Sequence, residues 1–167
     1  VYCEIHPFHL SAEAIMAKRP KGVILSGGPS SVTDADAPRV AADFYDRIDV
    51  PILGICYGMQ LVAVDLGGAS EPAARREYGA ATLKVLSGRT ALFNELPFEL
   101  DVWMSHGDHV TKLPGGFTTT ATTGDVITAI ENDERSIYCV QFHPEVSHTP
   151  LGKEILRNFV FNVCGCK

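Results

Sequence analysis

Short apolar runs alternate with amphipathic segments along the chain, which predicts an α/β fold with a mostly parallel central sheet and flanking helices. Residues 22–26 (GVILS) and 50–55 (VPILGI) are continuous apolar runs, and such runs are typical of fully buried parallel strands. Residues 57–66 carry apolar side chains at helical spacing, so we expect a helix there that ends at the Gly67-Gly68 pair.

The middle and the end of the chain contain further strand and helix patterns. Residues 80–129 are expected to form a strand-rich, antiparallel section, with strands over 82–86, 101–104, 117–122 and 126–130. A last strand over 137–142 and an amphipathic helix over 151–163 complete the prediction. Since no repeat or linker is recognisable, the chain is interpreted as one domain, residues 1–167.

Composition narrows the class of protein. The chain has 167 residues, 46% of them hydrophobic, and a formal net charge of −6, which excludes disorder and argues against a nucleic-acid partner. No stretch reaches the roughly 18 consecutive apolar residues of a membrane helix, so we expect no membrane partner. The five cysteines form an odd, scattered set, which favours a reducing compartment and hence a cytoplasmic location.

One pentapeptide carries the first candidate for chemistry. Residues 54–58 (GICYG) lie where a buried strand is expected to meet a helix, and this is the setting of a nucleophile elbow with sulfur in place of the serine oxygen. At a helix N-terminus, unpaired amides favour the thiolate of Cys56 over the thiol. The alternative is that Cys56 is a small core residue, and the pentapeptide alone does not decide between the two.

A second motif supplies a base. His143 follows the last predicted strand, and the ends of parallel strands meet at one sheet edge, where it could reach Cys56. Glu145 could accept the second imidazole N–H and orient the ring. A backbone amide of Tyr57 and one of Gly28 could bind a developing oxyanion, although residues 27–29 (GGP) also fit an ordinary turn.

Other patterns do not support a metal or nucleotide site. Residues 26–31 (SGGPSS) lack the features of a phosphate-binding loop, since Pro29 has no amide proton to donate. Short pairs of potential ligands do not group into a four-ligand set, so no metal is predicted: His6 with His9, His106 with His109, and Cys164 with Cys166.

Several motifs, in order along nearly the whole chain, resemble the triad-type glutamine amidotransferases. The first set is 27–29 (GGP), 54–60 (GICYGMQ) and 143–145 (HPE). A second set resembles more narrowly the glutaminase domains of GMP synthetases: 77–79 (EYG), 103–108 (WMSHGD) and 141–149 (QFHPEVSHT).

This resemblance implies a flavodoxin-like fold and a role for each matched position. Cys56 would be the nucleophile, His143 the base and acid, and Glu145 its orienting partner. The remaining implied residues are Gly28 and Tyr57 in the oxyanion hole, Gln60 against the substrate glutamine, and Ser105, His106, Gly107 and Asp108 against its amino-acid head group.

The resemblance also implies a reaction and partners. Glutamine would be hydrolysed to glutamate and ammonia through a γ-glutamyl thioester, with no cofactor in this domain. An ATP-pyrophosphatase synthetase domain or subunit, using ATP and Mg²⁺, would take the ammonia and convert XMP to GMP. Because the family's domain usually opens with one more strand and helix, we expect that residues 1–167 lack them. Two alternatives are a glutaminase of another pathway, such as anthranilate or carbamoyl phosphate synthesis, and a truncated, non-catalytic partner-binding module.

Overall fold

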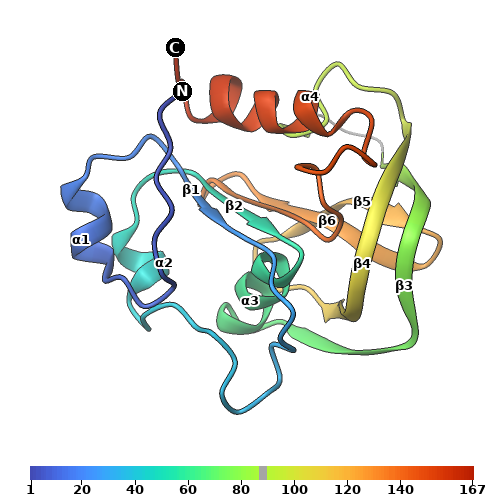
Figure 1. The fold of residues 1–167 in the computed structure, drawn as a ribbon, viewed down its shortest axis with the longest axis horizontal. Helices are drawn as coiled ribbons and strands as arrows, with labels where there is room; N and C mark the ends of the chain where they lie inside the picture. Colours follow the sequence, from blue (N-terminus) through green and yellow to red (C-terminus); the bar gives the residue numbers. More distant parts are fainter. Residues whose placement is uncertain (87–89) are drawn as a thin grey trace.

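A single mixed sheet organises the chain, as the computed structural model shows for residues 1–86 and 90–167, without the side chains of residues 75 and 76 (Figure 1). The strand order is β1-β2-β7-β6-β5-β3-β4. In chain order the strands are β1 (Val23–Leu25), β2 (Ile52–Ile55), β3 (Ala69–Val85), β4 (Glu99–Lys112), β5 (Thr118–Thr123), β6 (Val126–Asn132) and β7 (Ile137–Val140).

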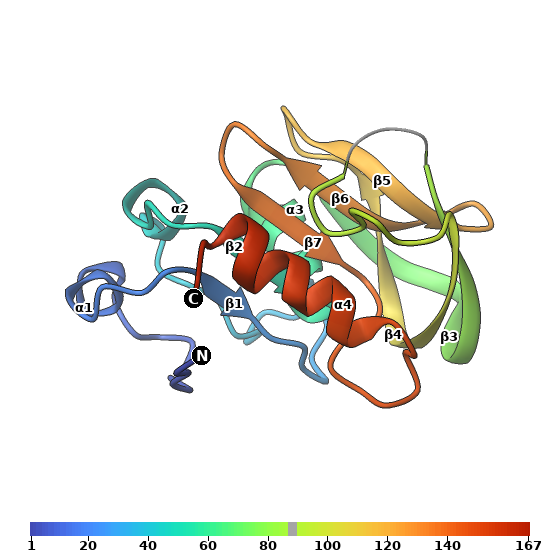
Figure 2. The ribbon, with the colours of Figure 1, turned by 90° about the horizontal axis from the view of Figure 1, so that it is seen from above.

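Helices cover both faces of this sheet. The face that α3 (Tyr57–Asp65) covers also receives apolar side chains from α1 (Ala12–Ala17) and α2 (Phe44–Arg47). The other face carries α4 (Gly152–Arg157), which continues as a π-helix, η1 (Asn158–Val163). Figure 2 shows α4 crossing in front of the central strands, with α3 behind them.

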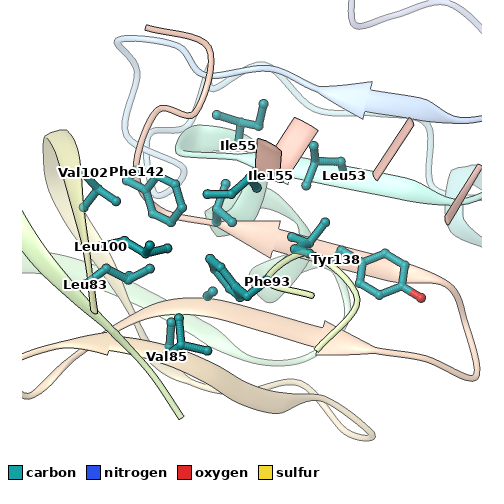
Figure 3. Packing of buried hydrophobic residues seen from close by; sticks show 14 of the residues in the cluster. Leu53, Ile55, Leu83, Val85, Phe93, Leu100, Val102, Tyr138, Phe142 and Ile155 are labelled. Carbon is teal, nitrogen blue, oxygen red and sulfur yellow. The ribbon is translucent and has the colours of Figure 1, made fainter. Parts of the chain in front are cut away.

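The central strands are buried because their side chains point alternately into two cores. On β2, Leu53 and Ile55 pack toward α4, while Ile52 packs toward α3. The first core also gathers Ile155 of α4 and Phe142 from the segment after β7 (Figure 3). All four residues of β2 and of β7 are buried, which matches a strand covered on both faces.

The predicted α/β class is confirmed, although the parallel part of the sheet is smaller than expected. Only β1, β2 and β7 pair in parallel, and the other pairings among the described residues are antiparallel. The expectation that residues 22–26 form a fully buried strand is wrong. β1 lies at the edge of the sheet, and its central side chain, Ile24, is 44% exposed.

The antiparallel section was predicted, but its strands β3 and β4 are longer than expected. β3 starts at Ala69 and β4 runs to Lys112, so the segment 105–108 belongs to a strand. Its Gly and polar residues carry little strand signal, and the pairing with β3 supplies the order. The final helix has the expected extent, with a π-helical second half. Residues 87–89, inside the predicted strand-rich section, lie outside the described residues.

Candidate active site

Cys56 occupies a tight turn between β2 and α3, as predicted for a nucleophile elbow. Its backbone has φ +52° and ψ −105°, a conformation that costs about 1–3 kcal/mol and is found mostly at functional sites. The flanking glycines are required by close packing. A Cβ on Gly58 would lie 2.1 Å from the carbonyl oxygen of Leu25, and one on Gly54 would lie 2.8 Å from that of Gly58. The sequence therefore holds the thiol in a strained, crowded turn.

The imidazole of His143 lies between the thiol of Cys56 and the carboxylate of Glu145. Its Nδ1 is 2.6 Å from Glu145 Oε1, and the Cys56 thiol nearby donates to the Ser105 carbonyl at 3.6 Å. The proximity of Cys56 and then of Glu145 raises the pKa of His143 to about 10 and so favours its imidazolium form. A Cβ on Gly27 would lie 3.0 Å from His143 Cε1 and 3.4 Å from Cys56 Cβ, so both side chains border the same glycine.

The loop that carries His143 is anchored by one buried threonine. Thr149 Oγ1 donates to the His143 carbonyl at 2.7 Å and accepts from the Trp103 amide at 3.1 Å. The His143 amide in turn donates to the Trp103 carbonyl at 3.1 Å. A Cβ on Gly152 would lie 1.9 Å from the Pro144 carbonyl oxygen, so the start of α4 packs directly on this loop. The backbone of Trp103 on β4 thus holds in place the loop that carries the His143 imidazole.

A cavity of about 500 Å³ opens beside the thiol. Nine of the ten residues expected at the site line it, and the tenth, Glu145, contacts His143 from behind. The lining residues are Gly28, Pro29, Ser30, Ser31, Cys56, Tyr57, Gln60, Tyr78, Ser105, His106, Gly107, Asp108 and His143. The amide of Tyr57 starts α3 and that of Gly28 has no backbone acceptor among the described residues, so both are available to an oxyanion.

Opposite the elbow, the wall of the cavity converges on Asp108. The Asp108 carbonyl accepts from Gln60 Nε2 at 3.0 Å and from His106 Nδ1 at 2.7 Å. The Asp108 carboxylate accepts from the Ser31 hydroxyl. Burial lowers the pKa of His106, which favours its neutral form. Gln60 also donates to Gln141 Oε1 at 3.3 Å, so its amide nitrogen is held by the protein, not left free for a ligand.

The sequence interpretation missed several residues that shape the site. Ser31 and Tyr78 line the cavity, and Gln141 and Thr149 orient residues that do. Ser31 directly follows the GGPS turn, and the other three lie in the motifs 77–79 and 141–149, so adjacency and motif membership were the available signals. The partners of Thr149 and Gln141 lie on other elements, so only the assembled fold identifies them.

The described part of the chain offers no metal centre, since no three His, Cys, Asp or Glu side chains group there to hold an ion. All five cysteines are free. Over residues 1–86 and 90–167, no helix has the length and apolar character needed to cross a membrane.

Comparison with known proteins places the sequence among the glutamine amidotransferases. Residues 1–163 match the family described as glutamine amidotransferase class-I. The chain is 49% identical to the GMP synthase (glutamine-hydrolyzing) of Alkaliphilus metalliredigens, over 100% of this chain and 32% of that protein. It is 53% identical to the protein of the same name from Carboxydothermus hydrogenoformans, over 99% of this chain and 32% of that protein.

Solved structures agree with the family match. A Thermoplasma acidophilum protein, provisionally named as one of the subunits of a GMP synthase, has a TM-score of 0.83 at 31% identity, over 97% of this chain and 80% of that one. A Thermotoga maritima glutamine amidotransferase, with a TM-score of 0.74 at 20% identity, covers 88% of this chain and 79% of itself and shows the same fold. The chain spans about a third of the length of the curated relatives it matches. From the match over residues 1–163, the chain belongs to the class-I glutamine amidotransferase family of enzymes.

Proposed function

We propose that this protein hydrolyses the side-chain amide of glutamine, with Cys56, His143 and Glu145 as a catalytic triad. The observation that carries the proposal is a cysteine in a strained turn, beside an imidazole whose Nδ1 contacts a carboxylate, at the wall of an open cavity. Because Cys56 and Glu145 raise the pKa of His143, its imidazolium form is favoured, and we propose that this imidazolium pairs with a Cys56 thiolate. Such an ion pair provides the nucleophile and the proton donor together.

The first half of the proposed reaction releases ammonia. The Cys56 thiolate attacks the carboxamide carbon, a C–S bond forms, and the oxygen becomes an oxyanion near the amides of Gly28 and Tyr57. The His143 imidazolium protonates the nitrogen, the C–N bond breaks and ammonia leaves. A γ-glutamyl thioester on Cys56 remains, and His143 is now neutral.

The second half returns the enzyme to its starting state. Neutral His143 takes a proton from water as the water oxygen attacks the thioester carbonyl. The C–S bond breaks, glutamate is released, and thiolate and imidazolium are restored. Glu145 keeps Nδ1 as the donor through both halves, because its oxygen lies 2.6 Å from that atom.

We further propose that the ammonia serves GMP synthesis. The curated relatives are named GMP synthase, and this chain aligns with about a third of them, which supports a partner domain or subunit outside this chain. In this proposal, an ATP-pyrophosphatase synthetase uses ATP and Mg²⁺ to convert XMP to GMP, and residues 1–167 hold no cofactor. The five free cysteines support a reducing, cytoplasmic setting.

Isotope transfer tests the chemistry and the pathway together. The protein is mixed with a GMP synthetase domain, ATP, Mg²⁺, XMP and glutamine labelled with ¹⁵N at the side-chain amide. We expect equal amounts of glutamate and ¹⁵N-GMP, and neither product with the Cys56→Ala variant. Glutamate without labelled GMP would favour a glutaminase of another pathway. No glutamate at all would favour a non-catalytic binding module.

A further inference from the structure

We propose that Glu77 is a positioning residue for substrate binding, which acts through His106 on the wall opposite Cys56. This inference rests on the proposed glutaminase function and extends it to a residue outside the triad and outside the cavity lining. Glu77 lies on β3, outside the residues that line the cavity. Its influence on a ligand would therefore be indirect.

The contact between Glu77 and His106 is close and sequestered. Glu77 Oε2 lies 3.0 Å from His106 Nε2, with the His106 side chain 1% exposed and that of Glu77 29% exposed. Both atoms are buried, and neither has a hydrogen-bond partner of regular geometry among the described residues. His106 Nδ1 carries a proton, because the Asp108 carbonyl that it contacts can only accept. One further proton is needed between Nε2 and Oε2, since both would otherwise present lone pairs to each other.

The pair is the outer end of a continuous set of polar contacts. From Glu77 the contacts run to His106, then to the Asp108 carbonyl, and from there to Gln60 of the elbow helix. The Asp108 carboxylate is held by Ser31, in the loop after β1. These contacts therefore join four separate segments of the chain, and four of the five residues line the cavity: Ser31, Gln60, His106 and Asp108.

The β-sheet register brings Glu77 to this position. The pairing of β3 with β4 shifts between Pro72 and Glu77, and after the shift Glu77 lies opposite His106. Before the shift, Glu71 lies opposite His109, and Glu71 is exposed, with no ion pair within the described part of the chain. Strand β3 thus places two glutamates opposite two histidines of β4. Of the two glutamates, Glu77 contacts a histidine that lines the cavity. Glu71 is the matched control.

Inactivation by a diazoketone analogue of glutamine separates binding from chemistry. Attack by the Cys56 thiolate on the protonated diazo carbon forms a C–S bond and expels N₂, so KI reports binding and kinact reports the triad. With the chain of residues 1–167, we expect Glu77→Ala to raise KI about tenfold, because His106 loses its partner, and to leave kinact within about twofold. Glu77→Gln, whose amide N–H can donate to Nε2, should keep KI within about threefold of wild type.

A control variant shows whether a change in KI or kinact is specific to Glu77. Glu71→Ala should match wild type in both constants. Equal KI for Glu77→Ala and wild type, or a loss confined to kinact, would overturn the positioning role. Failure of Glu77→Gln to restore KI, with thermal unfolding unchanged, would also overturn it. If the wild-type protein itself is not inactivated at Cys56, the proposed glutaminase function fails instead, and that result is distinct from all of these.

Discussion

The two walls of the cavity are built in different ways. The wall with Cys56 and His143 forms at the ends of parallel strands, where a few adjacent residues fix the backbone. The wall with His106 and Asp108 forms within a long antiparallel pair, β3 and β4, whose register shifts along its length. The turn around Cys56 is therefore determined locally, whereas the position of His143 and the whole second wall depend on contacts between segments far apart in the sequence.

The energetics of the walls differ as well. Around Cys56, the backbone is strained and there is no room for side chains at Gly54 or Gly58. Around Asp108, the structure is held by hydrogen bonds from three separate segments and not by close packing against glycines. Substitutions on the first wall should therefore damage chemistry or folding, whereas those on the second should change binding.

The largest effect is expected at the imidazole. His143→Ala should reduce glutamate release about 10³-fold or more, since general acid–base catalysis is lost. Glu145→Ala should reduce it only about 10- to 100-fold, because Glu145 orients the ring from a half-exposed position while the base itself survives. Steady-state kinetics checks both. Equal losses in the two variants would contradict a purely orienting role for Glu145.

Folding should be next most sensitive, at Gly58. Gly58→Ala places a methyl group 2.1 Å from the Leu25 carbonyl oxygen, so β1 and α3 must move apart, at a cost of about 3 kcal/mol or more. Gly79→Ala, on β3, meets no atom within 4 Å and is disfavoured only by its φ of +108°, at about 1–2 kcal/mol. Urea unfolding compares them. A smaller loss at Gly58 than at Gly79 would refute the crowding of the elbow.

Thr149 links the two walls and should have an intermediate effect on stability. Thr149→Val leaves the Trp103 amide and the His143 carbonyl without their partner, which should cost about 1–2 kcal/mol. Thr149→Ser keeps the hydroxyl and should recover most of that loss. Urea unfolding measures both variants, and glutamate release should fall in the Val variant as His143 loses its anchor. Identical behaviour of the Val and Ser variants would contradict the hydrogen-bond explanation.

The last prediction is a pH dependence of stability. His143 has a pKa of about 10 in the folded protein and an ordinary histidine value of about 6.5 when unfolded. Its stabilising contribution is therefore complete below pH ~6.5 and is lost as pH rises toward about 10. Wild type should be more stable than His143→Gln at pH 6, with the difference shrinking toward pH 10. Unfolding at several pH values measures this, and a difference that grows with pH would contradict the predicted ion pair.

The two walls also show how far sequence reasoning reaches. The position of Cys56 between β2 and α3 was predicted because two glycines and an apolar run constrain the backbone within five residues. The pairing of Glu77 with His106 was not, because it depends on a register shift that the local sequence does not reveal. Ile24 was expected to be buried because it lies in a continuous apolar run. That run does not reveal that β1 lies at the edge of the sheet, where the side chain of Ile24 is exposed.

The most direct test locates the sulfur that attacks the substrate. After treatment with the diazoketone analogue of glutamine, peptide mass spectrometry should find a single adduct on Cys56. Excess glutamine should prevent this adduct, and Cys56→Ala should abolish it. A label on Cys164 or Cys166, or a Cys56 label indifferent to glutamine, would show that the cavity beside the elbow is not a glutaminase site.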